Sequence, residues 1–198
     1  MEKSLANKKF GLVIMASGLG KRFGGNKLME ELDGKPLISY VLRATAGLFF
    51  KTVVVTRNDE VETFCRAQGV EVVKHSLPYR SDTVRLGIGR MDGCQACMFS
   101  PADQPLISRE SVAKMLEAAA ADGESIFRLG FGEKVGAPIL FPAPYFEELA
   151  ALPEGKGGSY VARNHPAALR TIAASSEIEL FDIDTVEDME YIKKVVSG

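Results

Sequence analysis

Short apolar runs alternate with segments of helical periodicity along the chain, and this alternation limits the fold more than any other feature. The runs with the length of single strands are residues 10–15, 51–56, 70–74, 95–100, 124–129, 137–141 and 178–183. Most are apolar on both faces, which is typical of strands covered by helices on each side. Helical patterns cover residues 36–47, 60–68, 82–90 and 108–121. We therefore predict an α/β fold, a mostly parallel sheet with helices on both faces.

Three helix-start signals stand out in these patterns. Pro36 fits the first turn of the helix predicted at 36–47. Ser108, followed by Glu110 and a long apolar-periodic run, is typical of an N-cap. Ser81 is the natural N-cap of the helix predicted at 82–90.

Chain length and charge set further limits. The chain has 198 residues and a formal net charge of −2. We expect one domain over residues 1–198 and no nucleic-acid partner, because phosphate-backbone binding needs a basic surplus. No apolar stretch is long enough to span a membrane, and residues 1–10 lack the apolar core of a signal peptide. We therefore expect a cytoplasmic protein with no membrane partner.

The cysteines of the chain are Cys65, Cys94 and Cys97. An odd number in a reducing compartment argues against disulfides. Cys94 and Cys97 form a C-x-x-C pair, but no second pair accompanies it, and the only histidines are His75 and His165. We favour buried thiols at the start of a strand over a zinc or redox site.

The first apolar run leads into an unusual loop, GLVIMASGLGKRFGGNKL at residues 11–28. It contains the glycines Gly18, Gly20, Gly24 and Gly25 and the cations Lys21, Arg22 and Lys27. Its spacing fits neither the phosphate-binding P-loop nor the dinucleotide-binding turn. Backbone N–H groups of such a loop can close around an anion while Arg22 and Lys27 supply charge, which suits a triphosphate. The alternative is a glycine-rich turn with solvated cations.

The loop resembles the signature of the nucleotidyltransferases related to the molybdenum-cofactor guanylyl- and cytidylyltransferases, MobA and MocA. Their loops run close to L-A-[AG]-G-x-S-x-R-[MF]-G-x-x-K-L. The matching positions are Ala16, Gly18, Arg22, Gly24, Lys27 and Leu28. Ser17 replaces the usual alanine or glycine, and Gly20 replaces the usual serine. Only a backbone role therefore remains for Gly20.

The resemblance continues through segments 34–42, 53–56, 101–108, 135–141 and 181–189. It implies a Rossmann-like three-layer α/β/α sandwich of the nucleotide-diphospho-sugar transferase type. An NTP-binding part is expected at about 9–107 and an acceptor-binding part at about 108–198. The implied chemistry is transfer of a nucleoside monophosphate from an NTP to a phosphate, with release of pyrophosphate.

Carboxylates near strand ends are candidates for Mg²⁺, which prefers hard oxygen ligands. Asp103 follows a buried strand at the edge where such sheets hold ligands, and the resemblance makes it the metal-binding aspartate. The alternative is an aspartate that caps the ADQP turn. Asp182 and Asp184 alternate on a predicted strand end, so only one should face the site. By the resemblance, Asp184 better fits the C-terminal metal or substrate ligand of the related enzymes, although a helix-capping role is equally consistent with it.

The resemblance also assigns the remaining site residues. Arg22, Lys27 and Asp103 are the expected catalytic residues. We expect Lys27 to have little packing to lose, because it ends a flexible glycine loop. Nucleotide contacts are expected from Ala16, Ser17, Gly18, Gly20, Arg22, Lys27, Arg80 and Thr83, and acceptor contacts from Gly136, Gly158 and Arg163. His75 is interpreted as an ordinary loop histidine, because an ionised phosphate acceptor needs no general base.

The sequence predicts the class of each substrate, the nucleotide and the acceptor. Relatives that use CTP tend to carry A-A-G after the first strand and those that use GTP tend to carry A-G-G, so the A-S-G of residues 16–18 favours CTP. The expected acceptor is a molybdopterin-type cofactor, with a client molybdoenzyme as a possible partner. Lys156 stands where many relatives carry aspartate, which leaves the acceptor open. The alternatives are a sugar- or polyol-phosphate acceptor and a non-catalytic chaperone that binds cofactor.

Overall fold

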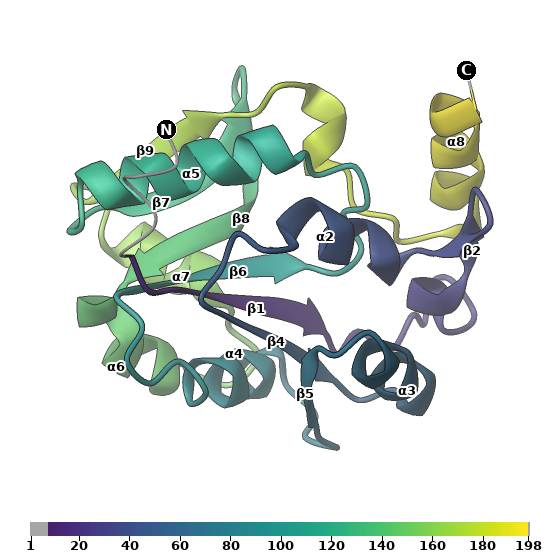
Figure 1. Ribbon diagram of the computed structural model, residues 1–198, viewed down its shortest axis with the longest axis horizontal. Helices are drawn as coiled ribbons and strands as arrows, with labels where there is room; N and C mark the ends of the chain where they lie inside the picture. The colour runs from purple at the N-terminus through teal and green to yellow at the C-terminus, as the bar shows by residue number, and fades with distance from the viewer. Residues whose placement is uncertain (1–7, 198) are drawn as a thin grey trace.

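The computed structural model describes residues 8–197 and contains one large sheet (Figure 1). Its seven strands lie in the order β5 (Glu71–Lys74), β4 (Lys51–Thr56), β1 (Phe10–Ala16), β6 (Ala96–Pro101), β8 (Lys134–Pro142), β7 (Ile126–Phe131) and β9 (Leu169–Ala173). Only β8 runs antiparallel to its neighbours in this sheet. The short strands β2 (Glu31–Leu32) and β3 (Lys35–Pro36) form a separate ribbon.

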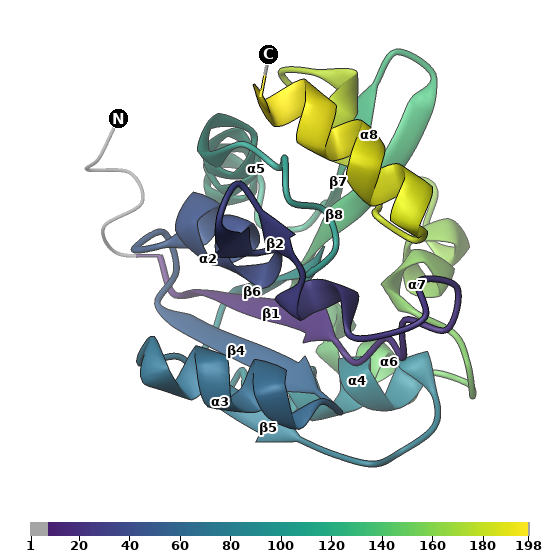
Figure 2. The same cartoon turned by 90° about the vertical axis from the view of Figure 1, so that its right-hand side faces the viewer.

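Helices cover both faces of the sheet. They are α2 (Ile38–Thr45), α3 (Asp59–Ala67), α4 (Arg80–Ile88), α5 (Arg109–Ala121), α6 (Phe146–Ala150), α7 (Gly158–Asn164) and α8 (Val186–Ser197). One buried cluster joins α2, α3, α5 and α8 to one face, and a second joins α4, α6 and α7 to the other. Figure 2 shows α2 and α4 on opposite sides of β1. The predicted three-layer α/β/α fold is therefore confirmed.

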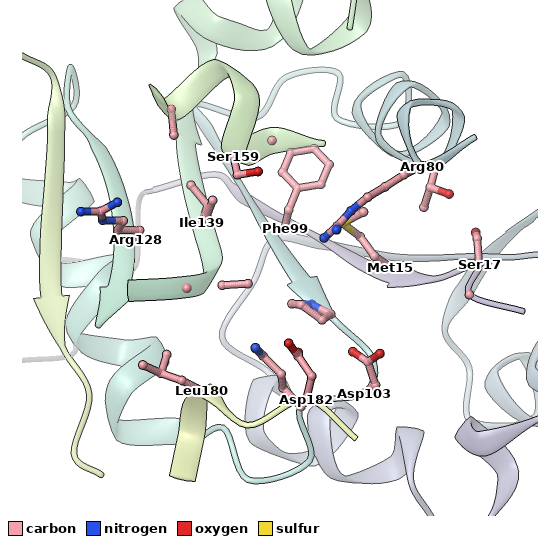
Figure 3. Close-up of a pocket in the computed structure, with 18 of the residues that line it drawn as sticks. Met15, Ser17, Arg80, Phe99, Asp103, Arg128, Ile139, Ser159, Leu180 and Asp182 are labelled. Carbon is pink, nitrogen blue, oxygen red and sulfur yellow. The ribbon is translucent and has the colours of Figure 1, made fainter. Parts of the chain in front are cut away.

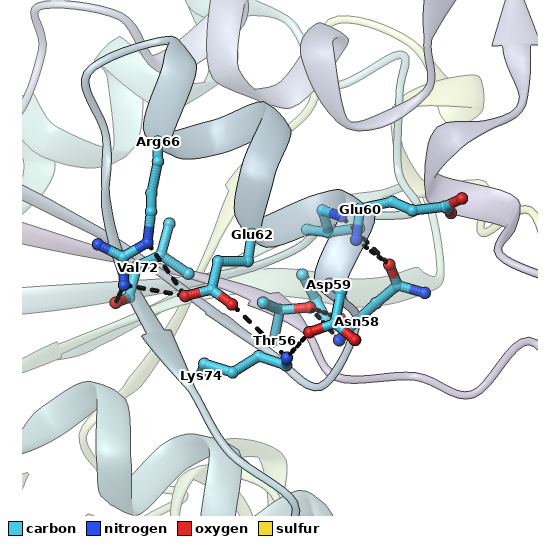
Figure 4. Close-up of polar contacts among 10 residues, drawn as sticks. Thr56, Asn58, Asp59, Glu60, Glu62, Arg66, Val72 and Lys74 are labelled. Atoms are coloured by element: carbon cyan, nitrogen blue, oxygen red, sulfur yellow. Dashed lines mark hydrogen bonds and ion pairs between the residues drawn. The ribbon is translucent and has the colours of Figure 1, made fainter.

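Polar contacts shown in Figure 4 hold the start of α3, the helix that follows β4. Asn58 is the N-cap of α3, and its Oδ1 accepts hydrogen bonds from the backbone N–H groups of Glu60 and Val61 at 2.9 and 3.2 Å. Such a cap satisfies donors that the first helical turn leaves free. Lys74 of β5 forms ion pairs with Asp59 and Glu62, which ties the helix to the edge strand.

The prediction of a strand at residues 178–183 is wrong. Residues Glu177–Leu180 form the 3-10 helix η3 instead. The Glu179 carboxylate is buried, and it accepts hydrogen bonds from the backbone N–H groups of Ser108, Ser175 and Ser176. These bonds fold the segment into a tight turn that an apolar pattern does not reveal. The seventh strand is β9, whose mostly exposed residues pair with β7 at the sheet edge.

Two of the three predicted helix starts are wrong. Ser108 is confirmed as the N-cap of α5, because its Oγ accepts from the backbone N–H of Ser111 at 3.0 Å. Helix α4 begins two residues earlier than predicted: Tyr79 is its N-cap and Ser81 is fully buried inside its first turn. Asp82 supplies the capping carboxylate, which accepts from the Tyr79 N–H at 2.9 Å. Pro36 lies in β3 and precedes α2, because the β2–β3 ribbon occupies that segment.

The cysteines are buried free thiols, as predicted. Burial raises the pKa of Cys65 to about 11, so it stays protonated at neutral pH. Among the helices of residues 8–197, none is both long enough and apolar enough to cross a membrane.

Helix α4 packs so closely on β1 at Gly87 that there is no room for a side chain at this position. A Cβ at this position would lie 2.5 and 2.8 Å from the two Cγ atoms of Val13. We expect Gly87→Ala to lower the free energy of unfolding by about 1–2 kcal/mol, because overpacking outweighs the gain in helix propensity. Urea denaturation measures the difference. Gly123→Ala, where a Cβ meets nothing within 4 Å, is the matched control. Equal stability of both variants would contradict this account of the interface.

Candidate active site

A cavity of about 940 Å³ opens at the carboxyl ends of β1 and β6 (Figure 3). Its walls come from the glycine-rich loop, the start of α4, the β7–β8 hairpin, α7 and the segment between η3 and α8. The predicted site residues that line it are Ser17, Gly18, Arg22, Arg80, Thr83, Asp103, Gly136, Gly158, Arg163 and Asp184. Ala16, Gly20 and Lys27 do not line it. Most of the predicted residues are thus gathered around one cavity, large enough for a nucleotide and a second ligand.

Gly20 of the glycine-rich loop has a backbone conformation and a close contact that only glycine fits. Gly20 has a φ of 57°, and a Cβ there would lie 2.0 Å from the carbonyl oxygen of Gly25. The Gly20 carbonyl accepts hydrogen bonds from the backbone N–H groups of Phe23 and Gly24 at 3.0 and 2.9 Å. A serine would therefore not fit this loop conformation. Gly20 shapes the loop and does not face the cavity.

Lys27 lies at the centre of a charge cluster beneath the loop. Its Nζ is 2.7 Å from Asp103 Oδ2 and 3.1 Å from Asp184 Oδ1, and it also donates to the backbone carbonyl of Ile183. Arg22 Nη2 lies 2.8 Å from Asp184 Oδ2. Burial disfavours the charge on Lys27, but the two carboxylates outweigh it and raise the pKa of Lys27. The cations predicted to bind phosphate thus neutralise the carboxylates predicted to bind metal.

This cluster corrects the expectation that Lys27 has little packing to lose. Only 7% of Lys27 is exposed. It connects the glycine-rich loop to the segment that follows β6 and to the segment before α8. Lys27 begins the 3-10 helix η1 (Lys27–Met29), so its backbone is ordered and its side chain is held by three acceptors.

Asp182 and Asp184 both line the cavity, which corrects the prediction that only one of them faces the site. The prediction assumed a strand, in which alternate side chains point to opposite faces. The segment is a loop before α8, so that alternation does not apply. Desolvation, together with the negative charge of Asp103 nearby, raises the pKa of Asp182 to about 6. Asp188, not Asp184, supplies the carboxylate that caps α8, with Thr185 as its partner.

Ser17 takes part in a network that sequence reasoning missed. Its Oγ donates to the backbone carbonyl of Val55 at 3.1 Å and lies 2.8 Å from His75 Nε2. Since the hydroxyl has one proton, His75 must donate to it from Nε2. Burial, helped by the positive charge of Arg57, lowers the pKa of His75 and keeps this imidazole neutral. His75 therefore positions Ser17. The sequence did not reveal this role, because a single histidine in a polar loop carries no pattern that indicates its partner.

Arg57 is a second residue that the sequence did not reveal. Its Nε donates to the carbonyl of Ser17 at 3.0 Å, and its Nη1 donates to the carbonyl of Leu77 at 3.1 Å. The side chain also lines the cavity. Arg57 thus holds the glycine-rich loop against the loop that precedes α4. Its place directly after β4, at the sheet edge where ligands bind, is the signal that could have found it.

The opposite wall contains the predicted acceptor residues. A Cβ on Gly158 would lie 3.0 Å from the ring of Phe141, so the start of α7 packs directly on β8. Arg163 lies one helical turn and a half further along α7 and faces the cavity. A Cβ on Gly157 would lie 3.0 Å from Nε and 3.2 Å from Cδ of Arg80, so the Arg80 side chain packs against the residue that precedes α7.

A parallel sheet with a cation-bearing glycine loop after its first strand, and carboxylates at the neighbouring strand end, is the architecture of a nucleotidyltransferase domain. Residues 12–169 match the family model of the MobA-like NTP transferase domain. The chain belongs to that family.

Individual relatives are more distant. The chain is 25% identical over 138 residues to a probable molybdenum cofactor guanylyltransferase of Bacillus cereus, a match that covers 67% of this chain and 66% of that protein. It is 26% identical over 139 residues to the bifunctional protein GlmU of Paramagnetospirillum magneticum, covering 64% of this chain and 30% of that one. The chain thus spans less than two thirds of the length of either relative.

Solved structures share the fold over nearly the whole chain. Rv0371c of Mycobacterium tuberculosis superposes with a TM-score of 0.82 at 21% identity, covering 95% of this chain and 99% of that one. A second structure of Rv0371c, in complex with manganese, superposes with a TM-score of 0.79 at 20% identity, covering 94% and 99%. At these identities the superpositions describe the fold alone.

Proposed function

We propose that the protein transfers a nucleoside monophosphate from an NTP to a phosphorylated acceptor and releases pyrophosphate. The observation that carries this proposal is the convergence of Arg22, Lys27, Asp103 and Asp184 near the carboxyl ends of β1 and β6, where ion pairs join Lys27 to both carboxylates and Arg22 to Asp184. Transfer between two anions depends on neutralising charge and aligning the reacting groups. Membership of the NTP transferase family supports the same reaction class.

In the proposed reaction, an oxygen of the acceptor phosphate forms a bond to the α-phosphorus of the NTP. The bond between the α-phosphorus and the oxygen that joins it to the β-phosphorus breaks, and pyrophosphate leaves with the electron pair of that bond. The acceptor phosphate is already ionised, so no side chain has to remove a proton. Arg22 and Lys27 are the groups that stabilise the charge on the leaving pyrophosphate, which requires both to turn from the carboxylates toward the phosphates.

Asp103 and Asp184 fit a magnesium site of the kind that uses one or two carboxylates together with substrate phosphates and water. Both are partly exposed at the cavity, and Lys27 shows that their oxygens can share one cation. Within the described residues, no group of three or more histidine, cysteine or acidic side chains could hold a metal. A bound Mg²⁺ would supply Lewis-acid stabilisation of phosphate charge. The manganese complex of Rv0371c supports a divalent-ion site in this fold.

The proposed acceptor is a molybdopterin-type cofactor, and the guanylyltransferase relative supports it. A client molybdoenzyme would then receive the product. The GlmU relative keeps a sugar-phosphate acceptor open as a second candidate. An acceptor panel of molybdopterin, a sugar 1-phosphate and a polyol phosphate, assayed for pyrophosphate release with each NTP and Mg²⁺, tests the reaction. Absence of pyrophosphate with every combination would favour a non-catalytic cofactor-binding chaperone.

The nucleotide preference gives a separate prediction. We expect CTP with Mg²⁺ to raise the Tm more than GTP or ATP, because Ser17 makes the loop more similar to that of CTP users. A ligand that binds only the folded state stabilises it by RT ln(1 + [L]/Kd), about 2.7 kcal/mol at 100 times Kd. Thermal shift at equal NTP concentration ranks the affinities. A larger shift with GTP, the nucleotide that the name of the guanylyltransferase relative indicates, would overturn the preference for CTP.

A further inference from the structure

One wall of the cavity contains an arginine to which no function has yet been assigned. Arg128 lies on β7, is half-buried and lines the cavity. Its Nε donates to Thr171 Oγ1 on the neighbouring strand β9 at 3.1 Å, which fixes the direction of the side chain. Figure 3 shows it at the far side of the cavity from Ser17, with Phe99 and Ile139 between them.

Arg128 has no negatively charged partner. Across residues 8–197, none of the ion pairs includes it. Lys134 lines the same wall and is neutralised by Glu177. A half-buried cation without a counter-charge is costly unless a ligand supplies one. The terminal nitrogens of Arg128 are left to provide the fork that binds carboxylate or phosphate oxygens.

The strands around Arg128 are shaped irregularly at this point. Arg128 pairs in register with Ile139, but the next residue, Leu129, pairs with Gly136, so β8 has two extra residues. Such bulges re-aim side chains and occur next to active sites. The bulged residue Ala137 and its neighbour Gly136 both line the cavity. Small residues therefore form the part of the cavity wall next to Arg128 along the β7–β8 pair.

The pairing register gives the shortest distance that a ligand must span. Phe99 of β6 pairs with Ile139 of β8, and Ile139 pairs with Arg128 of β7. Neighbouring strands are about 4.8 Å apart, so the backbone of Arg128 lies about 10 Å across the sheet from the strand that leads to Asp103, and its guanidinium, bonded to Thr171 on the next strand, lies further out. The floor over this distance is apolar and consists of Phe99 and Ile139, with Leu169 and Leu180 beside them.

We propose that Arg128 forms a distal anion subsite for the acceptor. This inference rests on the proposed function. The acceptor would be an elongated molecule with a flat apolar body over Phe99 and Ile139, its reacting phosphate near Asp103, and a second negatively charged group at Arg128. Acceptors that carry only the reacting phosphate would leave Arg128 unpaired and bind more weakly.

The test uses two fluorescent probes and no nucleotide. One is 2-naphthyl phosphate, and the other carries an added carboxylate at position 6, at the opposite end of the fused ring. We expect the wild-type protein to bind the doubly charged probe about tenfold more tightly, as a charge-assisted bidentate contact allows. Arg128→Gln should bind both probes equally, and Arg128→Lys should keep part of the difference because it keeps the charge.

Arg170→Gln is the matched control, because Arg170 lies on the next strand, donates to backbone carbonyls of Ala167 and Leu169, and does not line the cavity. It should keep the full preference for the doubly charged probe. Equal affinity of both probes for the wild type, or an unchanged preference in folded Arg128→Gln, would overturn the subsite. NTP-induced thermal shifts, which Arg128→Gln should leave intact, report separately on the proposed transferase. Their absence in wild-type protein would count against that function and not against the subsite.

Discussion

Asp103→Asn should abolish pyrophosphate release while the protein stays folded. Asparagine keeps the shape of the side chain and its ability to cap a turn, so a purely structural Asp103 predicts an almost normal enzyme. It removes the negative charge that pairs with Lys27 at 2.7 Å and that a magnesium ion would need. We expect turnover to fall by about a hundredfold or more, as loss of a charge-stabilising group does in other enzymes.

The measurement is pyrophosphate release against Mg²⁺ concentration, with the acceptor that gives the fastest wild-type reaction. Circular dichroism checks that the variant is folded. Asp92→Asn, an exposed aspartate in the turn after α4, is the control and should keep full activity. Wild-type turnover of Asp103→Asn at ordinary Mg²⁺ concentrations would remove Asp103 from the reaction and weaken the case for a metal-assisted transferase.

Many of the site residues could be predicted from the sequence because they directly follow buried strands. Asp103 comes two residues after β6 and the glycine-rich loop comes directly after β1, so parallel strands bring them to one edge. The same argument did not reach Asp182, because the fold of its segment depends on Glu179, which accepts hydrogen bonds from nearby Ser175 and from distant Ser108. A carboxylate that accepts from Ser108 across 71 positions of sequence leaves no local pattern.

Other features were unpredictable for a related reason. The neutral state of His75 depends on burial and on Arg57, which lies 18 positions away in the numbering. The unpaired charge of Arg128 depends on the absence of a carboxylate beside it in space, and a sequence with similar numbers of acids and cations does not reveal which cations are paired. The state of each side chain depends on which charged groups lie near it in space. Strand ends and helix caps such as Ser108 depend on neighbours in sequence, and a sequence pattern can therefore predict them.

The second large effect is expected from Lys27→Met, which keeps the apolar stem of the side chain and removes its charge. Asp103 and Asp184 would then share the cluster with only Arg22 as a partner. We expect turnover to fall by about a hundredfold or more, because a cation meant for the phosphates is lost. Breaking the buried pair should also cost about 2 kcal/mol, or about 4–8 °C in Tm for a domain of this size.

Mg²⁺ without nucleotide separates this explanation from a general loss of stability. In the wild type, Lys27 already occupies the two carboxylates, so Mg²⁺ alone should change the Tm little; in Lys27→Met the freed carboxylates should bind the ion and recover part of the lost Tm. Lys21→Met, an exposed lysine of the same loop, is the control for charge loss and should behave like the wild type. If Mg²⁺ stabilises Lys27→Met no more than the wild type, Asp103 and Asp184 do not form a shared cation site.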